Sequence, residues 1–444
     1  MGEKSRLAKF QEIVAMVKAG RKPPLPDLGV RATWTNIGGT LHVAALVLLG
    51  DAFEGVLALP NFPFLTDLEI TGTELTEVDV SQNVALTRLS VGSTMMDTLD
   101  VSKNTALTCL EVESDLLLTL DISNNPSLTR LIANDNHLSV LDLSKNPALT
   151  SLNVSDNQLA GLDCSNLAVL TELDAGYNQL TSLDVSKNPA LTSLCANNNQ
   201  LTAVDFSRNP ALARLDVSSN RLAALDVSKN TGLKILHADC NQLSELEISD
   251  NAALITLFVD CNRLTALDVS KCAELRLLEA YNNRLTEIDL AANPALRSLV
   301  IFGNQLTTVD VARNTALEHL DLSGNQLTTV DVARNTALRH LDLSANRLTT
   351  LDVSANSDLT DLNAALNQLT SLDLANNPKL TDLNVANNPL RELLVIDYAF
   401  YERLAMIFGE DGQDDQDEMF NITYVDDDDN DEDNDDEEDG DIDE

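Results

Sequence analysis

Aromatic residues are scarce in this chain of 444 residues: Phe, Trp and Tyr together make up 4% of it, and there is a single Trp. The apolar side chains available for burial are therefore mainly those of Leu, Val, Ile and Ala, which favours many small aliphatic layers over one aromatic core. The sequence also lacks an apolar run approaching the ~18 residues of a membrane-spanning helix. We therefore expect no membrane insertion.

Basic residues are also few, since 29 Lys and Arg stand against 70 Asp and Glu, for a formal net charge of −41. The last basic residue is Arg403, and residues 410–444 contain 21 acidic residues. Such a charge repels the phosphates of nucleic acids and of anionic lipids. The composition therefore excludes nucleic acid as a partner and favours a protein partner. A basic protein would complement the negative charge of this chain.

Paired cysteines are missing: the six Cys are scattered, without a C-x-x-C motif or a disulfide framework. A reducing compartment fits this pattern. The N-terminal stretch carries Glu12 and Lys18 and so lacks the uninterrupted apolar segment of a secretory signal. We expect a cytoplasmic protein, with secretion by a signal-independent route as the alternative.

Motifs of catalysis are missing as well. The chain has no G-x-x-x-x-G-K phosphate loop, no G-x-S-x-G nucleophile turn and no H-E-x-x-H metal motif. We predict that the protein is not an enzyme and uses no cofactor.

What the sequence does contain is a 21-residue repeat, L-x-x-L-x-(V/A)-x-x-N-x-L-x-x-L-D-V-S-x-N-x-x. Leu fills position one 16 times from Leu65 to Leu380, and position four 16 times from Leu68 to Leu383. Asn fills position nine in 13 successive repeats, from Asn136 to Asn388. A single repeat cannot bury its apolar face alone, so stacking of neighbours must provide the core.

The segment L-x-x-L-x-(V/A)-x-x-N-x-L resembles the conserved part of the leucine-rich-repeat family, from about Leu65 to Leu390. The short repeat and its L-D-V-S-x-N half resemble the bacterial internalin-like subclass with 21-residue repeats. The cysteine ladder of that subclass at position six is absent here, where aliphatic residues such as Val112 and Ala175 stand. The resemblance implies an α/β solenoid dominated by parallel β-structure, a right-handed coil of about 15–16 repeats.

We divide the chain into five segments. Residues 1–40 are expected to form an N-terminal amphipathic helix and a Pro-rich cap, and residues 41–64 a degenerate first repeat. Residues 65–390 hold the repeats. Residues 391–425 are expected to form a helical C-terminal cap with an edge strand near its end. Residues 426–444 are an acidic tail that self-repulsion should keep disordered, either as a solubilising segment or as an arm for a basic partner or cations.

The predicted binding surface is the concave face, where positions three, five, seven and eight point away from the core. Most of these positions are small or polar, but one stretch concentrates larger side chains, and aromatic anchors dominate binding energies. We predict a partner-binding patch there, made of Ile235, His237, Phe258, Leu277, Glu279, Tyr281, Val300, Phe302 and His319. The alternatives are drift at tolerated surface positions and packing of the rings on one another.

Two further groups allow more than one interpretation. His237, Cys240 and Cys261 could approach one another, but their spacing matches no recurrent zinc pattern. We predict no metal and reduced cysteines, with a metal site or a disulfide as alternatives. At position fifteen, fifteen acidic residues recur from Asp79 to Asp373. Each carboxylate either caps backbone N–H groups in its own turn or belongs to a stripe that binds Ca²⁺ weakly.

Together these patterns predict a non-catalytic protein-interaction module, a monomer that binds a macromolecular partner on its concave β-surface. One alternative is a secreted or surface-exposed bacterial effector or adhesin that recognises a host or cell-surface ligand. The second alternative is a structural spacer or Ca²⁺-binding acidic scaffold.

Overall fold

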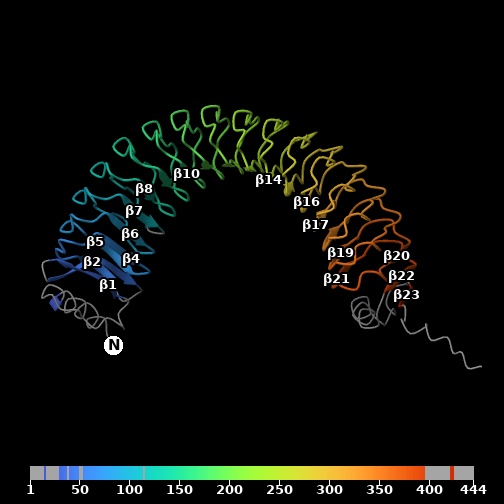
Figure 1. Cartoon of the computed structure of the whole chain (residues 1–444), viewed down its shortest axis with the longest axis horizontal. Coiled ribbons are helices and arrows are strands. Elements are labelled where there is room, and N and C mark those ends of the chain that lie inside the picture. Colours follow the sequence, from blue (N-terminus) through green and yellow to red (C-terminus); the bar gives the residue numbers. More distant parts are fainter. Residues whose placement is uncertain are drawn as a thin grey trace, which may run out of the picture. The chain divides into compact units, whose positions relative to one another are not determined.

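The computed structural model of this protein describes residues 15–16, 30–37, 40–49, 54–113, 116–395 and 421–424. The chain is divided into two compact units, residues 1–275 and 276–444. In each unit, the 21-residue repeats form successive coils, each with a short strand around the Leu at position four, and these strands lie side by side (Figure 1). The predicted parallel β-solenoid is therefore confirmed within each unit.

The core of each coil consists of the repeated leucines. In the strands the burial pattern alternates, so that the central Leu is buried and its two neighbours are more exposed. Leu152, Leu236 and Leu320, for example, are at most 1% exposed. Because alternate side chains of a strand point to opposite faces, this pattern leaves one face of the sheet free for other contacts.

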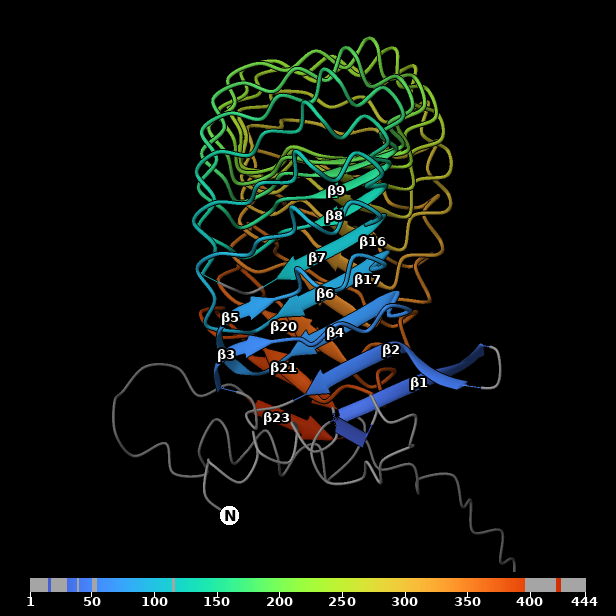
Figure 2. The ribbon, with the colours of Figure 1, turned by 90° about the vertical axis from the view of Figure 1, so that its left-hand side faces the viewer.

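The first unit contains a parallel sheet in which each strand pairs in register with the strand of the next coil (Figure 2). Its repeat strands are β4 (Asp67–Thr71), β6 (Arg88–Gly92), β7 (Cys109–Glu113), β8 (Arg130–Ile132), β9 (Ser151–Asn153), β10 (Glu172–Asp174), β11 (Ser193–Cys195), β12 (Arg214–Asp216), β13 (Ile235–His237) and β14 (Thr256–Phe258).

The N-terminal side of this sheet ends in an antiparallel pair. Strand β1 (Val30–Ile37) pairs with β2 (Thr40–Leu49), and β2 continues the parallel sheet by pairing with β4. Residues 30–37, in the segment expected to form the N-terminal cap, are thus a strand, which was not predicted from the sequence. Strands β3 (Glu54–Ala58) and β5 (Glu74–Asp79) form a separate parallel pair.

The second unit repeats the same arrangement. Its repeat strands are β15 (Leu277–Glu279), β16 (Ser298–Val300), β17 (His319–Asp321), β18 (His340–Asp342), β19 (Asp361–Asn363) and β21 (Asp382–Asn384). A second sheet of this unit contains β20 (Ser371–Asp373), β22 (Glu392–Val395) and β23 (Asn421–Tyr424), which pair in that order. The last of these is the edge strand predicted near the end of residues 391–425.

Two columns of buried Asn side chains join successive coils. At position nine, Asn157 donates from Nδ2 to the carbonyl O of Ala133 at 2.8 Å, and its Oδ1 accepts the N–H of Leu138 at 2.9 Å. At position nineteen, Asn146 donates from Nδ2 to the carbonyl O of Asn125 at 3.0 Å. Since a buried backbone group without a partner is costly, these amides fix the spacing of the coils.

The acidic column at position fifteen lies on the turn side of the coils and caps its own turns. Oδ1 of Asp142, for example, accepts the backbone N–H of Ser144 at 2.9 Å, and Glu247 does the same for Ser249. The hydrogen bonds from Ser144 lower the pKa of Asp142. The capping interpretation is confirmed by these contacts, which keep the carboxylates charged.

Helix contributes little to what the structure describes. Residues 15 and 16 are helical, and from residue 54 to residue 395 the described chain consists of strands, turns and bends. The α component of the expected α/β solenoid is therefore not supported, because tight turns suffice to close a 21-residue coil. The rest of the predicted N-terminal helix, the C-terminal helix and the acidic tail lie outside the described residues. Within these residues, no helix has the length and hydropathy to cross a bilayer.

Candidate functional site

We call one surface of the solenoid the strand face. It consists of the two side chains that flank the buried Leu of each strand and of two further side chains, three and four residues after that Leu. These are positions three, five, seven and eight of the repeat. The residues at position eight have a backbone in the left-handed region, with φ of 51° at Tyr177 and 52° at Ala345. This conformation turns the backbone at the same position of each described coil and presents positions seven and eight in the same way there.

The predicted patch is divided between the two units. Ile235, His237 and Phe258 belong to the first unit, on β13 and β14, and all three are half-buried. The remaining six residues belong to the second unit: Leu277, Glu279, Tyr281, Val300, Phe302 and His319. Leu277 is exposed, at 38%, and the other five are half-buried.

In the first unit, His237 has a contact on each side. Its ring stacks on that of Phe258, with the centroids 4.5 Å apart and the planes 9° from parallel. Its Nδ1 lies 3.5 Å from Oδ2 of Asp216. Asp216 also accepts hydrogen bonds from the N–H and the hydroxyl of Ser218. His237 is therefore fixed between an anion and an aromatic ring.

The carboxylates around this stack differ in their pKa. Burial would raise the pKa of Asp216, but hydrogen bonds from His237 and Ser218 outweigh it, so that the pKa is lowered. Burial and the nearby Asp260 raise the pKa of Asp239 to about 6. The strand face of this part of the first unit is thus acidic, with Asp216 held in its charged form.

In the second unit, the rings of Tyr281 and Phe302 form a matching stack. Their centroids lie 4.4 Å apart, and the planes are 9° from parallel. Both side chains stand at position seven, two residues after β15 and β16. The aromatic residues of the predicted patch therefore pack on one another within each unit, as one of the alternative interpretations held, while each pair remains partly exposed.

A hollow of about 430 Å³ lies on the strand face of the second unit, and we call it the acidic groove. Eleven residues line it, and none is Lys or Arg: His319, Asp321, His340, Leu341, Asp342, Asp361, Leu362, Asn363, Asp382, Leu383 and Asn384. Of these, the predicted patch contained only His319. The sequence does contain a signal for this groove, namely the recurrence of Asp at positions three and five of successive repeats. Taken singly, each of these Asp residues is an ordinary polar residue of the surface.

The histidines of the acidic groove are coupled to its carboxylates. The ring of His319 lies 5.7 Å from that of His340, and Nδ1 of His340 lies 2.8 Å from Oδ2 of Asp361. Burial and, second, the neighbouring His340 lower the pKa of His319. Burial raises the pKa of Asp321 despite its hydrogen bonds with Ser323. The lowered pKa of His319 favours its neutral form, so this histidine adds little positive charge to the groove near neutral pH.

The trio His237, Cys240 and Cys261 does not come together as a set. The structure places Cys240 beside Cys261, but His237 pairs with Asp216, and the third ligand-type group near the two thiols belongs to Asp260. The six cysteines are not joined in disulfides. Burial, and then the neighbouring Cys261, raise the pKa of Cys240 to about 11.

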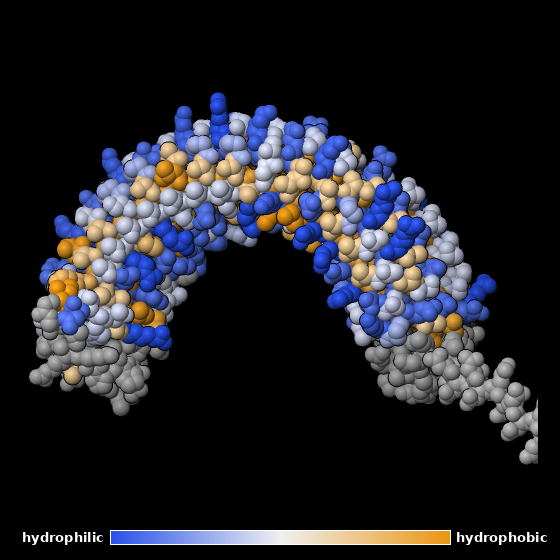
Figure 3. All heavy atoms as spheres, viewed as in Figure 1, coloured by the Kyte–Doolittle hydropathy of each residue, from blue (hydrophilic) through white to orange (hydrophobic). Residues whose placement is uncertain are grey.

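Hydrophobic residues do not gather into one broad patch on the side of the molecule that Figure 3 shows. Strongly hydrophobic residues appear there in small groups between polar ones within each unit. Two large exposed hydrophobic residues, Leu118 at 57% and Val140 at 72%, stand at positions twelve and thirteen of successive repeats, which are not positions of the strand face. This side of the molecule thus offers no broad apolar surface.

The fold defines a class of protein, the parallel-β repeat solenoid. Family models of leucine-rich repeats match residues 145–168 (one repeat) and 315–356 (two copies). The functional domain of InlJ from Listeria monocytogenes is 34% identical, with a TM-score of 0.67 over 71% of this chain and 69% of that one. The chain belongs to the leucine-rich-repeat family.

Other solved structures are similar at lower identity. YopM from Yersinia enterocolitica is 27% identical, with a TM-score of 0.61 over 79% of this chain and 82% of that one. A leucine-rich-repeat protein from Leptospira interrogans is 23% identical, with a TM-score of 0.58 over 78% and 91%, and shows the fold alone. Among curated protein sequences, none matches the chain significantly. Leucine-rich-repeat solenoids act in protein–protein interaction.

Proposed function

We propose that this protein is a non-catalytic, monomeric interaction module of the internalin-like subclass, which binds a basic segment of a protein partner on its strand face. The observation that carries the proposal is the acidic groove of the second unit. Its lining contributes Asp321, Asp342, Asp361 and Asp382, without a Lys or Arg among the eleven lining residues. Charge complementarity of this kind selects partners and accelerates their association.

The stacked aromatic pairs support the same proposal. Tyr281 and Phe302 on the second unit, and His237 and Phe258 on the first, present partly exposed ring surface on the face that also carries the carboxylates. Rings of this kind bind Lys and Arg side chains by contacts that combine apolar burial with attraction of the cation to the ring face. A partner segment with alternating basic and apolar residues fits this surface.

The test measures binding of a lysine- and arginine-rich peptide to the full chain by fluorescence anisotropy at low ionic strength. The double variant Asp342→Asn and Asp361→Asn removes two charges from the groove. We expect it to weaken binding by about tenfold, which corresponds to about 1.4 kcal/mol, and we expect salt to weaken binding by the unmodified chain.

A matched control removes the same number of charges from the turn side of the same unit. Asp310 and Asp331 each cap their own turn, at the N–H of Ala312 and Ala333. The double variant Asp310→Asn and Asp331→Asn should leave peptide binding unchanged. If both double variants weaken binding equally, the attraction is a property of the net charge, and the groove is not the site.

The aromatic part is tested separately with Phe302→Ser. Ser is the residue at the same position in the next two repeats, Ser323 and Ser344, so the coil accommodates it. Capture of partner proteins from a cell lysate should fall with Phe302→Ser and with Phe258→Ser, while thermal unfolding stays cooperative. Unchanged capture would restrict the binding site to the carboxylates.

A second candidate function is recognition of a host or cell-surface ligand by a surface-exposed or secreted form of the protein. The 34% identity with the Listeria domain favours it. Fractionation of the source cells distinguishes the two, since the first candidate places the protein in the cytoplasm and the second in the medium or on the surface.

A further inference from the structure

Two cysteines occupy the same position in adjacent coils of the first unit. Cys240 and Cys261 both stand at position eight, 21 residues apart, and both have a left-handed backbone, with φ of 51° and 52°. Strands β13 and β14 pair in register, and the N–H of Cys240 donates to the carbonyl O of Asp260 at 2.9 Å. Because the two backbones have the same conformation, their Cα–Cβ bonds project in nearly the same direction from neighbouring coils.

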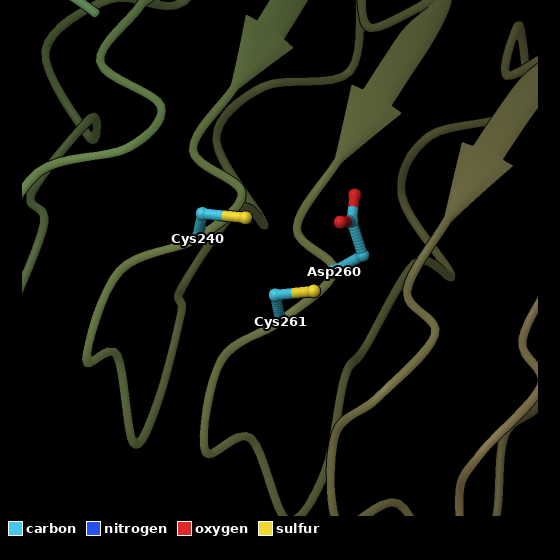
Figure 4. Close-up of side chains that lie close together, drawn as sticks. All are labelled: Cys240, Asp260 and Cys261. Carbon is cyan, nitrogen blue, oxygen red and sulfur yellow. The ribbon is translucent and has the colours of Figure 1, made fainter. Parts of the chain in front are cut away.

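A carboxylate completes this group. The Sγ atoms of Cys240 and Cys261 and a carboxylate oxygen of Asp260 all lie within 4.8 Å of one another. Figure 4 shows both sulfur atoms pointing toward the side on which the Asp260 carboxylate lies. Asp260 is buried, at 4% exposure, whereas Cys240 is exposed. Among the residues that the structure describes, no other set of three His, Cys, Asp or Glu ligand atoms comes this close together.

We propose that Cys240, Cys261 and Asp260 form a binding site for a thiophilic divalent metal ion of the Zn²⁺ type. Two thiolates and one carboxylate are a donor set that suits a soft or borderline ion and disfavours Ca²⁺ or Mg²⁺, which take oxygen ligands. Three protein ligands leave the fourth tetrahedral position open, and the exposure of Cys240 makes the site accessible from solvent.

The geometry needs only side-chain adjustment to bind such an ion. A tetrahedral ion with metal–sulfur bonds of about 2.3 Å separates two sulfurs by about 3.8 Å. The two sulfurs and the carboxylate oxygen already lie within 4.8 Å of one another, so we expect that rotation about χ1 of the two cysteines brings the sulfurs to this separation. The backbone is already fixed by the pairing of β13 with β14, so no chain movement has to accompany binding.

The surroundings also favour a cation. Asp239, one residue before Cys240, stands at the same position of its coil as Asp260, and Asp216 lies on the preceding strand. These carboxylates give this part of the strand face a negative potential that attracts metal ions. The inference does not rest on the acidic groove that carries the proposed function, because the groove belongs to the other unit.

The test uses Co²⁺ as a spectroscopic substitute for Zn²⁺ with the full-length chain, stripped of metal by a chelator and kept reduced by a phosphine. Coordination by thiolates produces a sulfur-to-cobalt charge-transfer band in the near ultraviolet. We expect the band to saturate at one Co²⁺ per chain and to disappear when Zn²⁺ is added. Absence of the band in the reduced protein would overturn the proposal.

Variants at the three ligands sharpen the test. Asn stands at position eight in other coils, as Asn198 and Asn282, with the same left-handed backbone, so Cys240→Asn and Cys261→Asn should fold. Each of these variants should abolish the band. Each should also weaken Zn²⁺ binding by more than the roughly 10–100-fold that is typical when a residue that only supports a metal ligand is replaced. Asp260→Asn should keep the band and weaken binding by at least about tenfold.

The control is another cysteine beside a carboxylate. Cys109 lies with its Sγ 3.7 Å from Oε1 of Glu111, but no third ligand-type residue joins this pair among the described residues. Cys109→Ala should leave the cobalt band and its stoichiometry unchanged. A band that survives in the double variant Cys240→Asn and Cys261→Asn would place the bound metal elsewhere and overturn the assignment. A chain that forms a Cys240–Cys261 disulfide in air but binds no metal when reduced would also overturn it.

Discussion

The side chain of Asn157 joins its own coil to the preceding one, because its Oδ1 accepts the backbone N–H of Leu138 at 2.9 Å while its Nδ2 donates to the carbonyl O of Ala133 at 2.8 Å. Asn220 and Asn325 make the same two kinds of contact in other coils. A solenoid is stabilised by the interfaces between neighbouring repeats rather than by each repeat alone. The strand face, and with it each proposed site, depends on these amides for its spacing.

Asn157→Ala is expected to lower the free energy of unfolding by about 3 kcal/mol, because it leaves backbone groups of two coils, its own and the preceding one, without this partner at about 1–3 kcal/mol each. Urea unfolding followed by circular dichroism measures this. The control is Asn166→Ala, since Asn166 is exposed and donates a single hydrogen bond to the carbonyl O of Ser144. Equal losses of unfolding free energy in the two variants would show that the burial of the Asn column at position nine does not contribute to stability.

The capping carboxylates predict a loss of stability in acid. Hydrogen bonds from Ser123, Ser144 and Ser165 lower the pKa of Asp121, Asp142 and Asp163. Their contribution is therefore complete above the unfolded pKa of about 3.9 and is lost as pH falls through the lower folded values. Thermal unfolding below about pH 4 should show this decline.

A triple variant tests the origin of that decline, because Asn in place of each of these three Asp can still accept the hydrogen bond but does not titrate. The decline in acid should be shallower for the triple variant than for the unmodified chain. The exposed Glu245→Gln, a charge change outside the capping position, should leave the slope unchanged. Identical slopes for the triple variant and the unmodified chain would contradict the capping explanation.

His319 predicts a second pH dependence, of the second unit. Burial and His340 lower its pKa in the folded state, so the unfolded chain takes up the proton more readily. The stability is complete above the unfolded pKa of about 6.5 and decreases as pH falls below it. His319→Ser should remove this decrease between about pH 6.5 and 5, as measured by urea unfolding. The exposed His137→Ser serves as the control, and retention of the full decrease in His319→Ser would refute the assignment.

The left-handed position eight predicts changes in opposite directions. Leu366 has φ of 56° and is 55% exposed, whereas Gly324 has φ of 60° at the same position. Leu366→Gly should stabilise the chain by about 0.5–1 kcal/mol, since relief of left-handed strain exceeds the entropy that Gly gains on unfolding.

Gly324→Ala should destabilise by about 1–2 kcal/mol, because the new Cβ would also lie 3.3 Å from the backbone N of Gly303. Thermal unfolding of both variants checks the pair. Changes of the same sign in Leu366→Gly and Gly324→Ala would show that the backbone conformation is not the deciding factor.

The buried half of each coil could be predicted residue by residue. Leu152, Leu236 and Leu320 occur at a fixed interval, and only inward placement of that interval gives a continuous core. The antiparallel pair of β1 and β2 was missed, although Gly38 and Gly39 separate two runs rich in β-forming residues. That signal was available, since two glycines between such runs are typical of a hairpin.

The candidate sites were harder to predict, because they depend on partners in other coils. The sequence drew attention to His237, but its pairing with Asp216 and its stacking on Phe258 come from coils on either side. The acidic groove went unnoticed because Asp342 and Asp361 resemble the many other polar residues of this surface until register places them together.

The sequence by itself determined the coil, because leucines that recur every 21 residues form a continuous core when each repeat makes one coil. The same period also determines which residues occupy equivalent positions in successive coils. The tertiary structure decided which side chains of neighbouring coils contact one another. It placed Asp260 rather than His237 beside Cys240 and Cys261, and it made ring pairs of aromatic residues that the sequence presented singly. The physical reason is that apolar burial follows a pattern, whereas contacts between polar and aromatic side chains follow distances and directions that only the folded backbone sets.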